Sequence, residues 1–179
     1  VAVPAIGVAA GRHPSLAVVW FDAHGDLHSQ DSSPSGAFAG MALRAVIDGE
    51  APLGPLPAQR VPADRVVLVG ARDLDPDEEA FADTSDLRRV DVSALSDPQA
   101  VINAVRSTGA TTVYIHVDLD VLDPAVVTGV ALPVPFGAEA SHLVANIAAL
   151  RAQLPLVGAS ISGFAPSTPE AAVDDLGVI

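Results

Sequence analysis

The chain has 179 residues, of which 50% are hydrophobic and 17% charged, a balance that excludes a disordered protein and suits one folded domain. Its formal net charge of -13 makes nucleic acid and anionic membrane surfaces unfavourable partners, and it would attract a small cation or a divalent metal ion. The sequence has no cysteine, which excludes disulfides and thiolate zinc sites, and neither a signal-peptide pattern nor a membrane-length apolar run, so we expect a cytoplasmic protein.

Apolar segments that read as strands alternate with segments of helical character along the chain. The expected strands cover residues 16–21, 65–70, 88–92, 111–117 and 156–161. The expected helices cover residues 1–12, 37–48, a segment that starts at 75–76, residues 97–107, 138–153 and a short segment from 169. Because the strands are apolar throughout, they indicate a mainly parallel sheet covered on both faces, which is an α/β fold.

Three loops are expected between these elements. Residues 28–36 form a long polar loop of the kind that often faces a substrate. Residues 51–62 contain four prolines, which predicts a semi-rigid surface loop. Residues 128–137 are rich in glycine and proline and are expected to be irregular.

The first candidate site follows the strand that ends at Phe21. Asp22, His24 and Asp26 are spaced two apart, and alternate side chains of an extended chain point the same way. A single aspartate at the end of a strand is most often a turn residue. Three possible ligands in this spacing favour a metal site instead.

The strand at 111–117 ends in a second cluster, Asp118, Asp120 and Asp123. Ligands of open parallel sheets gather at the carboxyl ends of the strands, so both clusters should lie at one edge of the sheet. Carboxylates with a single imidazole and no sulfur suit Mn²⁺ or another hard to borderline divalent ion. Two such ions could share a bridging water and lower its pKa toward neutrality.

Asp22-Ala23-His24-Gly25-Asp26 and the segment from Asp118 to Pro124 resemble the two signatures of the arginase/agmatinase (ureohydrolase) family. Further landmarks occur in the family's order at residues 33–36, 70–76 and 164–166. The resemblance implies a three-layer α/β/α fold with a mainly parallel sheet. It also implies that residues 1–179 form a single arginase-like domain, shortened at its N-terminus and in its C-terminal helix relative to the family.

The resemblance implies a centre of two Mn²⁺ ions whose bridging hydroxide attacks the guanidinium carbon of a small cationic substrate, releasing urea and an amine. Asp22 and Asp118 would bridge the ions, and His24 and Asp120 would complete the second. Asp26 would bind the first ion and act in catalysis by passing a proton to the departing amine. Family members are often homo-oligomers, so self-assembly is also implied.

Asp75 and Glu78 match acidic positions that bind the substrate's amino group in the family's arginases. The alternative is that they are ordinary acids at the start of a helix, favoured by its dipole.

Several positions depart from the family pattern. The family's first metal ligand, a histidine, would precede the first residue of this chain, so one or two ions are expected. Ala37 and Ala39 stand where the family has Asn and His, and Gly163 replaces the Glu that holds the guanidinium. We therefore expect weak or no ureohydrolase activity from this chain alone.

Three hypotheses follow. The chain is an arginase-like hydrolase with an altered pocket, or a non-catalytic descendant that binds metal or another subunit, or a metallohydrolase that acts on a different amide or amidine.

Five other residues have open roles. Arg72 is expected to pair with neighbouring aspartates in a structural role, and Asp123 to be a turn residue before Pro124. His116 is either a core histidine or a hydrogen-bond partner of the metal ligands. His28 is a loop residue within possible reach of a substrate, and His142 is expected at the surface.

Overall fold

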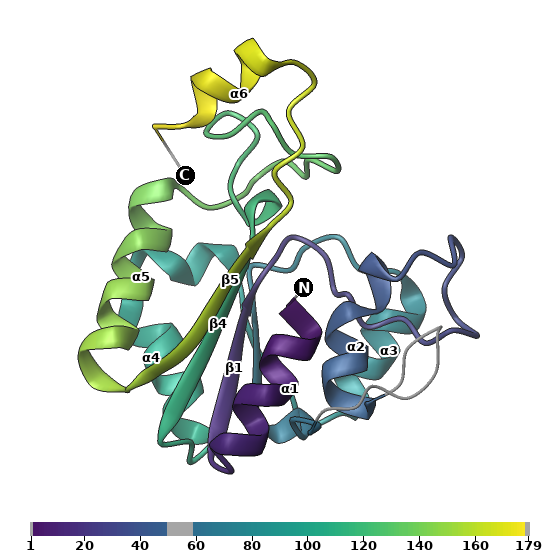
Figure 1. The fold of residues 1–179 in the computed structure, drawn as a ribbon, viewed down its shortest axis with the longest axis vertical. Coiled ribbons are helices and arrows are strands. Elements are labelled where there is room, and N and C mark those ends of the chain that lie inside the picture. The colour runs from purple at the N-terminus through teal and green to yellow at the C-terminus, as the bar shows by residue number, and fades with distance from the viewer. Residues whose placement is uncertain (1, 50–58, 178–179) are drawn as a thin grey trace.

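The computed structural model describes residues 2–49 and 59–177. Its centre is a parallel five-stranded sheet in the order β3-β2-β1-β4-β5 (Figure 1). The strands are β1 (Leu16–Phe21), β2 (Val66–Val69), β3 (Arg88–Val90), β4 (Thr112–Asp118) and β5 (Leu156–Ser162). All five predicted strands and the predicted parallel sheet are confirmed. The predicted loop at 51–62 lies mostly outside the described residues.

Helices cover both faces of this sheet. They are α1 (Ala2–Arg12), α2 (Ala42–Asp48), α3 (Pro76–Thr84), α4 (Pro98–Ser107) and α5 (Ala140–Gln153). A further helix, α6 (Pro169–Asp175), lies beyond the end of the sheet in Figure 1. In Figure 1, α4 and α5 lie on one side of the strands and α1, α2 and α3 on the other, which confirms the three-layer arrangement. Within the described residues, none of the helices has the length and apolar character needed to cross a membrane.

The two faces of the sheet carry separate hydrophobic cores, because side chains alternate along each strand. Ala17, Val19 and Phe21 of β1 pack in the core that α4 and α5 cover. Leu16, Val18 and Trp20 pack in the core that α1 and α2 cover. All of these β1 residues are buried, which is why the strand reads as a continuous apolar run.

The helix predicted at 37–48 begins later than expected. A single 3₁₀ turn covers Ala39–Met41, and α2 starts at Ala42. The backbone N–H of His28 donates to the carbonyl of Gly40 at 3.0 Å, which ties this segment to the loop that follows β1. Residues 37–39 therefore stay outside the helix and exposed.

The order of the strands places both predicted ligand clusters together. From β1 the chain runs outward to β2 and β3, then returns to pair β4 with the other side of β1. Phe21 is in register with Val117, so the residues that follow each strand leave the sheet at the same edge. This is the topological switch point, where open α/β sheets commonly bind their ligands.

Candidate metal centre

The carboxylate of Asp22 is fixed at the end of β1 by two hydrogen bonds. The Trp20 indole Nε1 donates to Asp22 Oδ2 at 2.9 Å, and the backbone N–H of His24 donates to Oδ1 at 2.8 Å. Asp22 is only 2% exposed. Trp20 precedes Asp22 by two residues on the same face of the strand, so the alternation of β1 aims the indole at the carboxylate. Sequence reasoning treated Trp20 as core only and missed this contact.

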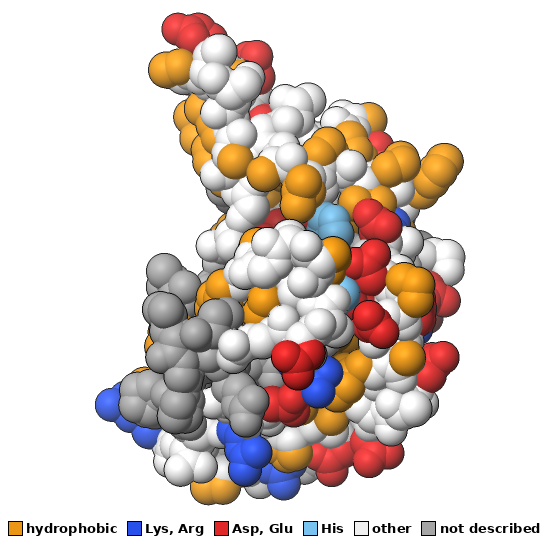
Figure 2. Space-filling model, turned by 90° about the vertical axis from the view of Figure 1, so that its right-hand side faces the viewer, with side chains coloured by type: hydrophobic (Ala, Val, Ile, Leu, Met, Phe, Trp, Pro, Cys, Tyr) orange, Lys and Arg blue, Asp and Glu red, His pale blue; other side chains and the backbone are white. Residues whose placement is uncertain are grey.

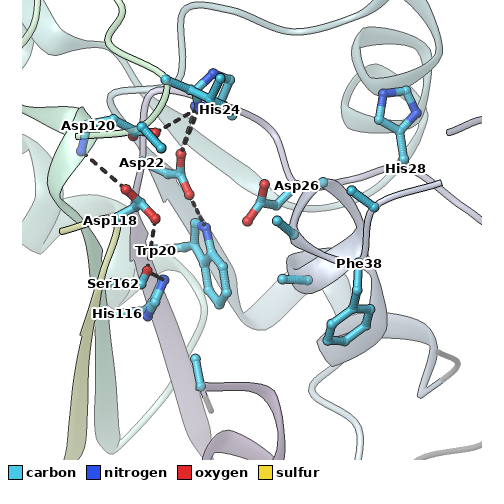
Figure 3. Close-up of a pocket in the computed structure, with 18 of the residues that line it drawn as sticks. Trp20, Asp22, His24, Asp26, His28, Phe38, His116, Asp118, Asp120 and Ser162 are labelled. Atoms are coloured by element: carbon cyan, nitrogen blue, oxygen red, sulfur yellow. Dashed lines mark hydrogen bonds and ion pairs between the residues drawn. The ribbon is translucent and has the colours of Figure 1, made fainter. Parts of the chain in front are cut away.

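The carboxylates at the end of β4 lie against the first cluster. Asp120 Oδ1 accepts from the backbone N–H of Ala23 at 2.9 Å, and Asp120 Oδ2 lies 2.9 Å from His24 Nδ1. Asp118 Oδ1 accepts from the backbone N–H of Asp120 at 3.2 Å. The two Asp120 bonds join the ends of β1 and β4, so four of the five predicted ligands, all but Asp26, converge as shown in Figure 3.

The convergence does not come from an extended chain, as the sequence argument supposed. Leu119–Val121 form a 3₁₀ turn directly after β4, and Asp26 has a φ of 53°, in the left-handed region. Turns rather than strand alternation therefore bring the later side chains of each cluster toward the cavity, because the chain leaves the sheet at Asp22 and Asp118.

Two compact sets of ligand atoms form at this edge of the sheet. Within the part of the chain that the structure describes, Asp22, His24 and Asp120 offer one set, and Asp22, His116 and Asp118 offer another. The atoms of each set lie within 4.8 Å of one another. Asp22 belongs to both, so the arrangement suits two neighbouring cations that share one carboxylate.

Burial and mutual repulsion raise the pKa values of several of these carboxyl groups. The pKa of Asp22 rises to about 7, chiefly because burial disfavours its charge, with the nearby Asp120 and Asp118 adding to the shift. Burial and a neighbouring aspartate likewise raise the pKa of Asp118. Carboxylates that repel one another in a buried site are what a divalent cation would stabilise, so the donor set fits a metal ion.

His24 partly compensates this negative charge. Its hydrogen bonds to Asp120 and Asp22 raise the pKa of the imidazole to about 10, against the opposing effect of burial. Burial alone would raise the pKa of Asp120, but the hydrogen bonds from His24 and from the Ala23 N–H outweigh it and lower that pKa. A protonated His24 therefore stabilises the cluster, and a metal ion would have to displace that proton.

Asp26 faces the same cavity from the side opposite Asp22 (Figure 3). Its pKa is raised well above the ordinary value by burial first, and then by the charges of Asp22 and Asp118. Its backbone carbonyl accepts from the N–H of Arg44 at 2.9 Å, which holds the turn after β1 against α2. Asp26 belongs to none of the three compact ligand sets among the described residues, of which the third, His28, Asp75 and Glu78, lies farther out along the cavity.

His116 is buried beside the ligands, in contact with two serines of β5. Its Nδ1 lies 2.8 Å from Ser160 Oγ and its Nε2 lies 3.1 Å from Ser162 Oγ. Ser162 Oγ in turn donates to Asp118 Oδ2 at 2.8 Å. The ring also packs on Trp20, with centroids 3.9 Å apart, and burial lowers its pKa to about 4. The two sequence-based alternatives both hold, because His116 is a buried histidine that also reaches a ligand through Ser162.

Asp75, Glu78 and His28 lie together farther out along the cavity. Glu78 is 5% exposed, and its Oε1 and Oε2 accept from the backbone N–H groups of Leu27 and Asp75, at 2.9 and 3.0 Å. His28 Nε2 lies 2.9 Å from Asp75 Oδ2. Glu78 thus holds the loop after β1 onto the start of α3, while Asp75 and His28 form a pair that lines the cavity.

The cavity that these residues line has a volume of about 950 Å³. Figure 2 shows acidic and histidine side chains gathered in the middle of one face of the molecule, with hydrophobic side chains nearby. The predicted departures, Ala37, Ala39 and Gly163, all line this cavity. Phe38 and Ile161 line it as well, at 40% and 62% exposure, so its outer part is open and largely apolar.

Gly163 has a structural reason to be glycine. Its φ is 86°, and a Cβ built on it would lie 2.0 Å from Asp118 Oδ1. Any side chain at this position would therefore collide with a candidate metal ligand unless the backbone moved.

Arg72 does not pair with aspartates as the sequence suggested. It donates instead to backbone carbonyl oxygens, those of Gly70, Asp120, Val121, Val134 and Pro135. Its planar fork of five donors suits a ring of carbonyls where several segments meet, which explains this choice. Asp123 is a turn residue, as predicted, because its carboxylate accepts from the N–H groups of Ala125 and Gly137. His142 is half-buried rather than fully at the surface.

The fold and the site together define an α/β protein with a candidate metal centre at the switch point of a parallel sheet. Over residues 1–174 the chain matches the Arginase family, and it belongs to that family. The resemblance seen in the sequence is thereby confirmed, and the family's members include hydrolases.

Three relatives show the extent of the similarity. The chain is 33% identical to an arginase of Staphylococcus aureus over 132 residues, which cover 69% of this chain and 43% of that protein. It is 29% identical to the N(omega)-hydroxy-L-arginine amidinohydrolase of Streptomyces lavendulae, covering 100% of this chain and 63% of that protein. The crystal structure of arginase from Bacillus cereus superposes with a TM-score of 0.82 at 26% identity, covering 99% of this chain and 64% of that one. The chain spans about half the length of the curated arginases that it matches.

Proposed function

We propose that this chain is a manganese-dependent hydrolase of the ureohydrolase type, which cleaves a guanidino group to urea and an amine. The observation that carries the proposal is the convergence of Asp22, His24, Asp118 and Asp120 where β1 and β4 end. Membership of the Arginase family supports the same reaction class. The printed names of two relatives, arginase and hydroxyarginine amidinohydrolase, support a small guanidino substrate.

The donor set supports a centre of two ions. Asp22, His24 and Asp120 would hold one of them, and Asp22 and Asp118, with Asp26 nearby, would hold the other. Carboxylate oxygens with few imidazoles and no thiolate suit Mn²⁺. Divalent ions bound here would supply a water of lowered pKa as the nucleophile.

The side chains around the ions would orient the substrate and move protons. Asp26 faces the cavity from the side opposite Asp22, where it would pass a proton to the departing amine. Of the two acids farther out along the cavity, Asp75 keeps its carboxylate substantially exposed. We therefore propose that Asp75 binds the positive amino group of the substrate. Glu78 would act there mainly by holding Asp75 and the loop after β1 in place, since both its oxygens accept backbone N–H groups.

Release of urea from arginine or agmatine, or of hydroxyurea from N-hydroxyarginine, by the Mn²⁺-loaded chain tests the proposal. We expect slow turnover that Asp118→Ala abolishes. Asp123→Ala is the matched control, because Asp123 also follows β4 but serves a turn. Turnover that persists in Asp118→Ala would refute a reaction at this centre.

A non-catalytic descendant that keeps the metal centre is the second candidate. The observation that favours it is the outer cavity, where Gly163 leaves no room for a side chain and Ala37 and Ala39 offer no polar group. Such a protein would bind Mn²⁺ and hydrolyse none of the three guanidino compounds. Native mass spectrometry on the same samples would show whether metal binding goes with assembly into a homo-oligomer. A parallel screen of simple amides would reveal a different metallohydrolase.

A further inference from the structure

His116 is a buried histidine that lies beside the candidate metal ligands. It belongs to β4 two residues before Asp118, is 3% exposed and lines the cavity. Figure 3 shows its ring below Asp118, with Ser162 between the two. Ser162 Oγ lies 3.1 Å from His116 Nε2 and 2.8 Å from Asp118 Oδ2. One hydroxyl group therefore spans the gap between a ring nitrogen and a carboxylate oxygen.

The two compact ligand sets have the same composition. Each contains two carboxylates and one imidazole, with His24 in one set and His116 in the other, and both sets include Asp22. We propose that His116 is a direct metal ligand, which holds one ion together with Asp22 and Asp118 while Asp22, His24 and Asp120 hold the second. This inference rests on the metal centre of the proposed function and gives each ion its own imidazole.

The surroundings of His116 fit this role. In the metal-free chain Ser162 Oγ donates its one proton to Asp118, so its contact with Nε2 requires an Nε2–H. Metal binding would require the proton to move to Nδ1, where Ser160 Oγ, 2.8 Å away, can accept a hydrogen bond from it. Metal-bound histidines usually donate their second ring N–H to a fixed acceptor in this way. Trp20 packs on the ring and holds its orientation. Nε2 and Asp118 Oδ2 would then meet at the ion, and Ser162 would give up its bond to the ring.

Glutamine substitutions separate a ligand from a hydrogen-bonding residue. His116→Gln keeps an amide that can bond to Ser160 and Ser162, but an amide is a poor replacement for an imidazole ligand. Metal-free wild-type, His116→Gln and His24→Gln chains are titrated with Mn²⁺ by calorimetry. His142→Gln, on α5 and outside the cavity, is the control. We expect two ions for the wild type and the control, and one ion for each of the other two variants.

Pulsed electron paramagnetic resonance of the Mn²⁺-loaded double variant His24→Gln and His28→Gln provides an independent readout, because His116 is then the imidazole left in the three ligand sets of the described residues. We expect modulation from a coordinated ¹⁴N nucleus. Absence of that modulation, two ions in a folded His116→Gln chain, or a single ion in the wild type would each overturn the inference. If the wild type took up no Mn²⁺ at all, the proposed function would fail with it. If only His116→Gln kept both ions, the proposed function would stand and His116 would not be a ligand.

Discussion

The floor and the rim of the cavity are built from different parts of the fold. The floor consists of Asp22, Asp118 and Asp120 at the ends of β1 and β4, and each carboxylate accepts at least one backbone or side-chain hydrogen bond. The rim consists of Ala37, Phe38, Ala39 and Gly163, which line the cavity from loops. The difference teaches that the sheet fixes the candidate metal site, whereas the loops around it set what that site could hold.

Removal of a floor carboxylate should have the largest effect. We expect Asp118→Ala to weaken Mn²⁺ binding by more than about 100-fold, because even changes to groups around a ligand commonly cost 10–100-fold. Asp123→Ala should leave the affinity within about threefold, since its carboxylate accepts turn N–H groups only. Calorimetric titration measures both. Equal losses in the two variants would mean that the floor is not the binding site.

A side chain added at Gly163, on the rim, should displace Asp118 on the floor. Gly163→Ala adds a Cβ 2.0 Å from Asp118 Oδ1 at a φ of 86°, whereas Gly109 has a φ of 69° and open space around it. We expect Gly163→Ala to cost about 2–4 kcal/mol of unfolding free energy, from backbone strain and overpacking together. Gly109→Ala should cost only about 1 kcal/mol, from strain alone.

Denaturant unfolding of both variants checks this difference, and the Mn²⁺ affinity of Gly163→Ala should fall as Asp118 is displaced. Gly163→Glu, which restores the residue type of the resembling family, should fail in the same way rather than gain activity. Equal stability of the two alanine variants would contradict the predicted collision.

Polar groups introduced at the rim should raise turnover without changing the binding of Mn²⁺. The double variant Ala37→Asn and Ala39→His places an amide and an imidazole at exposed positions beside the cavity. We expect kcat/KM for a guanidino substrate to rise about 10-fold, a modest part of what a positioned proton carrier can contribute. Mn²⁺ stoichiometry should be unchanged. Ala148→His, on the exposed face of α5, is the control that should leave turnover unaltered.

The charge of the floor should make the metal-free protein less stable as the pH rises. The pKa of Asp22 is about 7 in the folded chain against an ordinary value of 3.8, so the native state binds more protons than the unfolded state between these values. Stability therefore falls as the pH increases through this window. Because the pKa of His24 is raised from 6.5 to about 10, the stability continues to fall as the pH rises above 6.5.

We expect the thermal midpoint of the metal-free chain to be about 5 °C lower at pH 8 than at pH 5, which corresponds to ~1–2 kcal/mol for a protein of this size. Saturating Mn²⁺ should remove or reverse the trend, because metal binding requires deprotonated ligands. Asp22→Asn should flatten the metal-free curve. A midpoint that stays level or rises between pH 5 and pH 8 without metal would show that the pKa of Asp22 is not raised in the folded chain.

The sequence predicted which residues meet at the floor but not the contacts that hold them there, for physical reasons. Fully apolar strands indicate a parallel sheet, and strand ends that carry Asp22 and Asp118 place ligands at its edge whatever the details of the turns. The bond between Asp120 and the Ala23 N–H depends on the 3₁₀ turn at Leu119–Val121, which the alternation of apolar residues did not reveal.

The contacts that sequence reasoning missed join residues far apart in the chain. Ser162 reaches Asp118 because β5 pairs in register with β4, and nothing in the local sequence of β5 specifies that register. His28 and Asp75 meet because Glu78 binds the loop after β1 to the start of α3. The carbonyl partners of Arg72 come from three separate segments of the chain.

The most direct measurement is an Mn²⁺ titration of the purified, metal-free chain, followed by calorimetry and by the fluorescence of Trp20. Trp20 is the single tryptophan of the sequence and donates to Asp22, so its emission reports on the floor itself. We expect saturable binding of two ions, with fluorescence quenching that ends at the same ratio and disappears in Asp118→Ala. Absence of saturable binding, or binding that leaves Trp20 unchanged, would contradict a metal centre at the ends of β1 and β4.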